Sequence, residues 1–135
     1  MHIRVLGSAA GGGYPQWNCN HPNSRRARQR DPAAPQRTQS SIALSSDGER
    51  WALFNASPDL RQQINDTPAL HPRDGLRHTP IAGVVLTGGD VDVVAGLLTL
   101  RERQPFTLHA SHRIHDVLDA NPIFEVLARD VVTRS

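Results

Sequence analysis

The stretch that decides the fold is Gly7-Ser8-Ala9-Ala10-Gly11-Gly12-Gly13-Tyr14-Pro15-Gln16-Trp17-Asn18-Cys19-Asn20. It directly follows Met1-His2-Ile3-Arg4-Val5-Leu6, which predicts a first strand over residues 2–6. Glycine is costly inside a strand or helix, but it adopts positive φ and lets another group approach the backbone closely. Four glycines in seven residues therefore predict that this strand ends in a loop. Loops that a rigid scaffold holds tend to carry function, so we expect this one to line a site.

The chain after this loop alternates strands with helices. Residues 41–45 predict a strand, Asp47-Gly48 a tight hairpin turn, and residues 51–55 the returning strand. Ser57-Pro58-Asp59 predicts a helix start, because serine suits the N-cap, proline the first helical position and aspartate the positive end of the helix dipole. The pattern then predicts strands over 81–87 and 107–110 and helices over 94–100 and 111–118. This order indicates an α/β layered fold.

Composition narrows the class of protein. The 135 residues suffice for one domain with an aliphatic core. The balance of 15 basic to 13 acidic residues gives a net charge of +2, which argues against a nucleic-acid partner. The single cysteine excludes an internal disulfide and fits a reducing compartment. No signal peptide is evident, and no apolar stretch approaches the roughly 20 residues of a membrane helix. We therefore expect a cytoplasmic protein without a membrane span.

Residues 20–40 have almost no hydrophobic periodicity. They include Arg25-Arg26-Ala27-Arg28-Gln29-Arg30, which is basic and is followed by prolines. A structureless stretch of this length is uncommon in a compact domain and is usually functional or disordered. The arginines could grip phosphate, but they have no aromatic partners and no overall positive excess behind them. We therefore expect a solvated, mobile loop here.

Three strings resemble one known family. They are the glycine-rich opening, Arg37-Thr38-Gln39-Ser40-Ser41-Ile42, and Asn55-Ala56-Ser57-Pro58-Asp59-Leu60. Their order and spacing are similar to the coenzyme PQQ synthesis protein B family of the metallo-β-lactamase-like superfamily. The resemblance implies that residues 1–135 form the first half of an αββα sandwich, because family members continue well past the position of Ser135. An isolated half would expose an apolar sheet face, which favours a homodimer or aggregation.

The segment Leu86-Thr87-Gly88-Gly89-Asp90-Val91-Asp92-Val93 has the place of the superfamily's His-x-His-x-Asp-His metal cluster. The resemblance puts Gly88 and Asp90 where the first two histidines would be. It keeps Asp92 as the aspartate ligand and replaces the last histidine with Val93. Two carboxylates without imidazole make a poor zinc or iron site. Two interpretations stay open: a weak metal site at Asp92 and Asp90, or a polar turn that caps the next helix.

Cys19 and His21 form a second candidate for metal binding. Many family members carry Cys-x-Cys-x-x-Cys here, and three thiolates at that spacing typically bind structural zinc. Only one thiol and one imidazole remain, so two further ligands would have to come from elsewhere, such as His2 or His78. The alternatives are a loop cysteine and histidine without metal, or a redox or nucleophilic thiol that His21 assists.

The resemblance implies a role in the biosynthesis of pyrroloquinoline quinone (PQQ), in concert with other proteins of that pathway. The chain would act on, or carry, the peptide-derived precursor or PQQ itself, with transport toward the periplasm as one form of this role. One alternative is a hydroxylase of the precursor tyrosine that depends on iron or zinc, and another is an inactive fragment. Whether the chain is an enzyme stays open. The expected substrate pocket is formed by Gly11, Gly12, Gly13, Trp17, Arg37 and Ser57.

Overall fold

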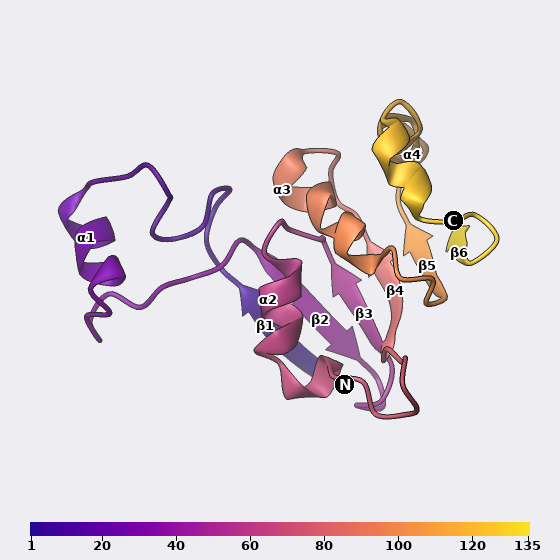
Figure 1. Cartoon of the computed structure of the whole chain (residues 1–135), viewed down its shortest axis with the longest axis horizontal. Coiled ribbons are helices and arrows are strands. Elements are labelled where there is room, and N and C mark those ends of the chain that lie inside the picture. The colour runs from indigo at the N-terminus through magenta and orange to yellow at the C-terminus, as the bar shows by residue number, and fades with distance from the viewer.

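A computed structural model describes all residues from Met1 to Ser135. Six strands form a single sheet in which the spatial order follows the chain, β1-β2-β3-β4-β5-β6. Helices α2, α3 and α4 cover one face of this sheet, and an arm that bears α1 extends from its β1 end (Figure 1). The predicted α/β fold is confirmed.

The first three strands form an antiparallel meander. They are β1 (His2–Gly7), β2 (Ser41–Ser45) and β3 (Trp51–Phe54), close to the predicted bounds. The turn between β2 and β3 depends on Asp47, whose Oδ1 accepts hydrogen bonds from the Glu49 and Arg50 amides and the Ser45 hydroxyl at 2.8–3.0 Å. These donors lower the pKa of Asp47 to about 2. Gly48 adopts a φ of 82°, as the predicted turn requires.

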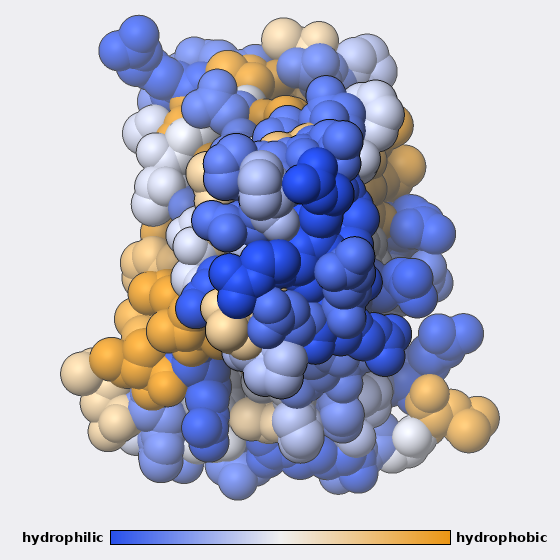
Figure 2. All heavy atoms as spheres, turned by 90° about the vertical axis from the view of Figure 1, so that its left-hand side faces the viewer, coloured by the Kyte–Doolittle hydropathy of each residue, from blue (hydrophilic) through white to orange (hydrophobic).

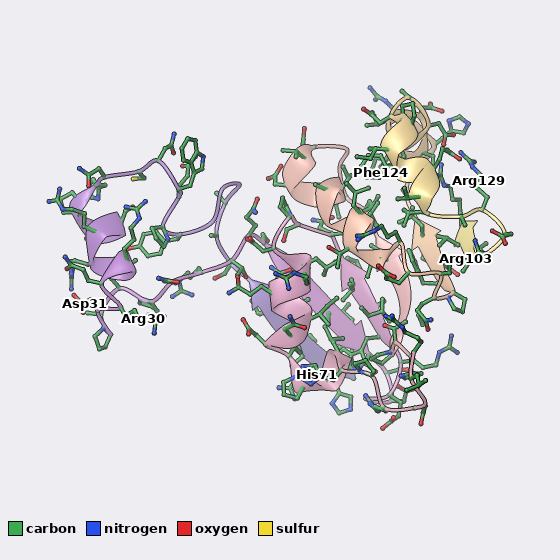
Figure 3. All side chains as sticks on the ribbon, in the orientation of Figure 1. Arg30, Asp31, His71, Arg103, Phe124 and Arg129 are labelled. Atoms are coloured by element: carbon green, nitrogen blue, oxygen red, sulfur yellow. The ribbon has the colours of Figure 1, made fainter.

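The remaining strands are parallel to β3. They are β4 (Ile81–Val85), β5 (Phe106–His109) and β6 (Val132–Arg134). Strand β6 was not predicted, since three residues carry too short a pattern to stand out from sequence. Arg134 of β6 is tied to Asp119, which also accepts a hydrogen bond from Arg129 at 2.7 Å. Figure 3 shows Arg129 at this end of the sheet, opposite Arg30 and Asp31 on the arm.

The helices differ in detail from the sequence prediction. Helix α2 (Leu60–Asn65) begins after Asp59, and the Ser57 hydroxyl accepts the Asp59 amide at 3.3 Å without being the N-cap. The predicted helix over 94–100 begins earlier, as α3 (Val91–Val94), and continues as the 3-10 helix η2 (Ala95–Leu100). Helix α4 (His112–Asp119) follows Ser111 as predicted. Two further 3-10 turns are η1 (Pro68–Leu70) and η3 (Pro122–Val126), and none of the helices could cross a membrane.

The two faces of the sheet differ in their covering. The face beneath the helices, called the covered face below, carries Ala43, Leu53, Val84 and Leu108, all with no exposed surface. Their neighbours along each strand point to the other side. The strand register groups these neighbours on one face, the open face, whose large apolar residues are Ile3, Val5, Ile42, Leu44, Phe54 and Val85. Ile3 is 56% and Val5 70% exposed, as expected for half of a sandwich.

The arm contains a helix that the sequence did not predict, α1 (Pro22–Arg28). The Arg28 guanidinium donates to the carbonyls of Cys19, Gln16 and Trp17, and the Tyr14 hydroxyl donates to the Asn23 carbonyl. These bonds fold residues 14–29 back on themselves. Only Ser24 and Ala27 of α1 are buried, and a helix of seven residues is too short for hydrophobic periodicity to reveal it. The mobility expected for residues 20–40 stays a prediction.

Candidate functional site

The carboxyl ends of four strands meet at one edge of the sheet. Because β1 and β3 are both antiparallel to β2, β1 runs in the same direction as β3, β4 and β5. The glycine-rich loop, the Asn55–Asp59 segment and the Thr87–Asp92 segment therefore leave the sheet at the same edge. Ligand sites of open α/β sheets lie at this edge. Its residues, which are distant in sequence, are the candidates for a functional site.

A chain of hydrogen bonds holds the glycine-rich loop to helix α2. The Gly12 amide donates to Gln39 Oε1 at 3.1 Å. The same Gln39 side chain donates from Nε2 to Asp59 Oδ2 at 3.1 Å, and the Gln39 backbone amide donates to that oxygen at 2.9 Å. Gly12 and Gly13 have φ angles of 93° and 74°, which favour glycine. The loop is therefore a fixed turn, not a flexible connection.

A second set of close contacts and hydrogen bonds surrounds Gly7. A Cβ added to Gly7 would meet the Gln39 carbonyl oxygen at 2.1 Å, so only glycine fits there. Gln63, which is 2% exposed, donates to the Gln39 carbonyl at 2.8 Å and to the Thr38 hydroxyl at 3.0 Å. Thr38 in turn donates to the Leu6 carbonyl at 2.9 Å. These contacts join the end of β1 to the segment before β2 and to α2.

An open hollow of about 540 Å³ lies beside the loop. Gly12, Gly13 and Arg37 line it, so three of the predicted pocket residues are brought together here. The exposed Arg37 guanidinium donates to the Ser8 hydroxyl at 3.2 Å, which leaves its other N–H groups free. Asp59 and Asp66 of the α2 region also line it. The hollow thus presents a cation with free donors beside a glycine turn.

The other predicted pocket residues lie elsewhere. Ser57 is fully buried, and its hydroxyl contacts Gln63 Oε1 at 3.4 Å behind the hollow. Trp17 is 84% exposed on the arm. Gly11 faces Asp92: a Cβ added to Gly11 would lie 3.0 Å from Asp92 Oδ2. The structure therefore brings the glycine loop to the aspartate that the sequence singled out, but leaves Trp17 and Ser57 outside the hollow.

Asp90 and Asp92 sit at the start of α3. Asp90 is the N-cap residue, and its carbonyl accepts the amides of Val93 and Val94 at 2.9 and 3.0 Å. Its side chain makes no capping hydrogen bond. No three histidine, cysteine, aspartate or glutamate side chains of the chain converge on one point. A metal at this edge would therefore need ligands beyond those that residues 1–135 supply, and these residues alone do not fit a zinc or iron ion.

Cys19 and His21 lie on the arm, apart from Asp90 and Asp92. Ser24 Oγ donates to Cys19 Sγ at 3.1 Å, and this bond, a backbone bond and the nearby Arg28 lower the pKa of the Cys19 thiol. His21 accepts the Asn23 amide at Nδ1, so it serves as the cap of α1. The suggested partners lie elsewhere: His2 packs near Trp51, and His78 accepts the Arg73 amide. The arm groups a thiol and an imidazole without further ligands.

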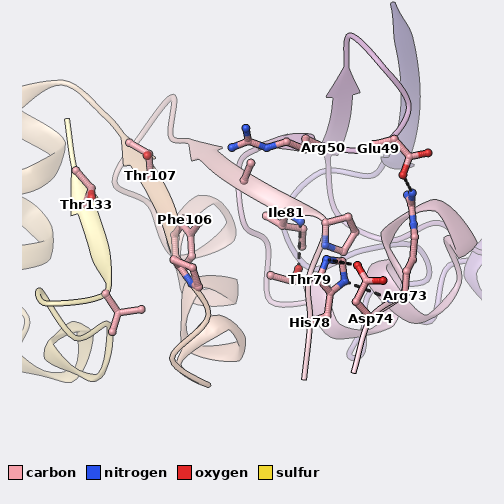
Figure 4. Close-up of a pocket in the computed structure, with 14 residues that line it drawn as sticks. Glu49, Arg50, Arg73, Asp74, His78, Thr79, Ile81, Phe106, Thr107 and Thr133 are labelled. Carbon is pink, nitrogen blue, oxygen red and sulfur yellow. Dashed lines mark hydrogen bonds and ion pairs between the residues drawn. The ribbon is translucent and has the colours of Figure 1, made fainter. Parts of the chain in front are cut away.

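A second hollow, of about 480 Å³, lies at the opposite edge of the sheet (Figure 4). Two ion pairs lie among its lining residues: Arg73 with Glu49, and His78 with Asp74 at 3.5 Å. It is lined by the beginnings of β4 and β5, including Ile81 and Phe106. Arg50 also lines this hollow and makes no ion pair. Because this hollow lies at the amino ends of the parallel strands, whereas ligand sites of open α/β sheets lie at the carboxyl ends, we place the functional site at the first hollow.

Gln39 and Asp59 are the residues that sequence reasoning missed. The sequence pattern indicates only a helix start at Asp59, and it gives Gln39 no role beyond its place in the 37–42 string. Their link spans 20 residues, which no local pattern can show. The signal that could have found them is their presence, together, in the two strings that carry the family resemblance.

Comparison with known proteins agrees with the fold. The beta-lactamase superfamily domain matches residues 50–134. The chain is 71% identical over 134 residues to coenzyme PQQ synthesis protein B of Gluconacetobacter diazotrophicus, and 61% identical to that of Xanthomonas oryzae pv. oryzae. These matches cover 99% of the chain but only 44% and 45% of the relatives. The chain thus spans less than half the length of the curated relatives it matches.

Solved structures show the same fold. Zn²⁺-bound PqqB from Methylobacterium extorquens matches the whole chain with a TM-score of 0.98 at 60% identity, over 48% of that protein. A diphosphatase of the PhnP family matches 98% of the chain and 48% of its own length, at 23% identity and a TM-score of 0.76, which shows a shared fold alone. The chain belongs to the beta-lactamase superfamily and, within it, matches the N-terminal half of the coenzyme PQQ synthesis protein B family.

Proposed function

We propose that the chain takes part in the biosynthesis of PQQ by binding a carboxylate-bearing molecule, the peptide-derived precursor or PQQ itself. The identity of 71% to a coenzyme PQQ synthesis protein B supports the pathway. The position of Arg37 carries the assignment of the site. Arg37 lines the hollow together with Gly12 and Gly13, and its guanidinium makes one hydrogen bond, to the Ser8 hydroxyl. Free guanidinium N–H groups form paired, charge-assisted hydrogen bonds with carboxylates.

The glycine turn supports this assignment. Gly13 lines the hollow without a side chain of its own, and an added Cβ there would meet no atom closer than 3.5 Å, whereas the Gln16 side chain lies against Gly12. A planar ligand can therefore approach the turn closely while its carboxylate reaches Arg37.

Metal-dependent hydroxylation of the precursor is a second candidate, which the Zn²⁺-bound relative and the contact of Asp92 with Gly11 favour. Residues 1–135 do not complete a metal site, so we assign no step through a metal. On this candidate, Asp92 would be one ligand and the others would come from outside these residues. Binding or carrying of the ligand at Arg37 is common to both candidates and is tested first.

The test is a titration of the protein, expressed from its native gene, with PQQ under calorimetry. We expect binding, and we expect Arg37→Ala to weaken it by about tenfold or more, the scale for a lost charge-assisted hydrogen bond. Arg113→Ala is the matched control, because Arg113 is an exposed arginine on α4, away from the hollow. Equal affinity of the wild type and Arg37→Ala would overturn the assignment of the site.

The same protein preparation also tests whether the protein binds zinc or iron. Its zinc and iron content is measured by mass spectrometry before and after Asp92→Asn. A metal that is present in the wild type and lost in Asp92→Asn would support the hydroxylase candidate. Absence of PQQ binding in the wild type, whatever the metal content, would favour the inactive fragment.

A further inference from the structure

The shape of the hollow depends on what holds the glycine turn in place, whichever ligand binds there. Gly12 and Gly13 line the hollow, and Gly12 is held by a side chain far from it in sequence. The Gly12 amide donates to Gln39 Oε1 at 3.1 Å. Gln39 is 7% exposed, so this bond is shielded from water.

Gln39 is itself oriented by Asp59. A primary amide can turn over and exchange its oxygen and nitrogen, and its neighbours decide which is presented. Asp59 Oδ2 accepts both Gln39 Nε2, at 3.1 Å, and the Gln39 backbone amide, at 2.9 Å. A carboxylate only accepts, so it fixes the Gln39 nitrogen toward itself. The Gln39 oxygen must then face the loop, where Gly12 donates to it.

The glycine turn also lies against Asp92. Gly13 donates to the Ala10 carbonyl at 3.1 Å, which closes a turn over residues 10–13. Gly11 lies within this turn and against Asp92, where an added Cβ would lie 3.0 Å from Oδ2. A shift of Gly12 would therefore move Gly11 relative to Asp92 as well as the wall of the hollow.

We propose that Asp59 and Gln39 are positioning residues: Asp59 orients the Gln39 amide, and this amide sets the glycine turn that forms the ligand hollow and faces Asp92. The inference deepens, and for its effect on ligand affinity rests on, the function proposed above. Neither residue needs to touch the ligand for this role. Ser57 supports the pair from behind, because its hydroxyl accepts the Asp59 amide at 3.3 Å.

The test uses four variants of the protein expressed from its native gene. Asp59→Ala removes the acceptor, and Gln39→Met removes the amide while nearly keeping its length. Asp59→Asn keeps an acceptor oxygen but removes the charge. Asp74→Asn is its matched control, because Asp74 is largely exposed and lies at the other hollow, away from the glycine turn. Each variant is measured by hydrogen exchange of the Gly12 amide without ligand, by affinity for PQQ, and by melting temperature.

We expect Gly12 to exchange about tenfold faster or more in Asp59→Ala and Gln39→Met, the factor for one lost hydrogen bond, with a matching loss of affinity. Asp59→Asn is expected to rescue both readouts, and Asp74→Asn to leave both unchanged. Unchanged Gly12 exchange in Asp59→Ala and Gln39→Met would overturn the proposal. An affinity loss in Asp59→Asn as large as in Asp59→Ala would also overturn it, because charge would then explain the effect.

The two proposals fail in different ways. If the wild type does not bind PQQ, the proposed function fails, while the exchange of Gly12 still tests the positioning pair. If Asp59→Ala does not fold, as its melting curve would show, Gln39→Met and the rescue by Asp59→Asn still decide the outcome.

Discussion

The covered and open faces of the sheet are built from similar residues but have different surroundings. Along β2, buried Ala43 alternates with half-buried Ile42 and Leu44. On the covered face, Leu53 and Val84 pack against helices and have no exposed surface. On the open face, Val5 is 70% exposed, and none of the residues of that face packs against the core. A strand that is apolar on both faces is typical of a sheet that lies between two layers.

The share of a relative's length that the chain matches is relevant to this difference between the two faces. The chain matches 48% of the Zn²⁺-bound PqqB structure with a TM-score of 0.98. Residues 1–135 contain one sheet with helices on one face, and the large apolar residues of the open face have no helix of these residues over them. Seen from the arm side, the centre of the surface is hydrophilic, and the largest hydrophobic area in view lies at the lower left (Figure 2). The predictions below measure how far the two faces differ.

The largest expected difference is between two glycines. A Cβ added to Gly96, under the covered face, would lie 2.1 Å from the Ser57 carbonyl oxygen and 2.8 Å from backbone atoms of Ala56. Gly96→Ala should therefore lower the free energy of unfolding by about 3 kcal/mol or more. Gly83→Ala in β4 is the control, because its Cβ would meet the nearest atom at 3.4 Å. Urea unfolding measures both, and equal losses would contradict the assigned packing.

The next difference is between two leucines on adjacent strands. Leu53 is fully buried on the covered face, and Leu44 is half-buried on the open face. We expect Leu53→Ala to lower the free energy of unfolding by about 3 kcal/mol and Leu44→Ala by about 1 kcal/mol. The measurement is again urea unfolding, on the 135-residue chain. Equal losses would mean that something covers the open face under the conditions used.

Self-association gives a third comparison. Ile3 and Val5 lie on β1 at the sheet edge, and both are more than half exposed. The double change Ile3→Thr and Val5→Thr keeps the β-branched shape while reducing the apolar surface. We expect the 135-residue chain to associate, and the double variant to associate less, by sedimentation velocity. The double change Val91→Thr and Ile123→Thr removes exposed apolar residues outside the sheet and is the control. Loss of association in the control alone would place the contact elsewhere.

The same comparison explains how much the sequence could reveal. Five of the six strands were predicted because apolar runs and the Asp47-Gly48 turn are local signals. Helix α1 and β6 were missed because seven and three residues carry little periodicity. Of the site, Gly12, Gly13 and Arg37 do lie together at one hollow. The roles of Gln39 and Asp59 depend on a contact between segments 20 residues apart, and the burial of Ser57 depends on Gln63 and η2, so local patterns could not reveal them.

The smallest expected effect concerns the turn that joins β2 and β3, whose residues belong to neither face. The pKa of Asp47 is about 2 in the folded protein, below its ordinary value of 3.8, because backbone amides and Ser45 donate to its carboxylate. A lowered folded pKa contributes stability above the ordinary pKa, and this contribution is lost as the pH falls toward 2. Asp47→Asn should therefore lower the melting temperature by a few degrees at pH 7, and the difference from wild type should shrink between about pH 4 and pH 2. Asp74→Asn is the control, since Asp74 is largely exposed and contacts only His78. A difference that stays constant across this range would show that the turn is held by shape and not by the charge of Asp47.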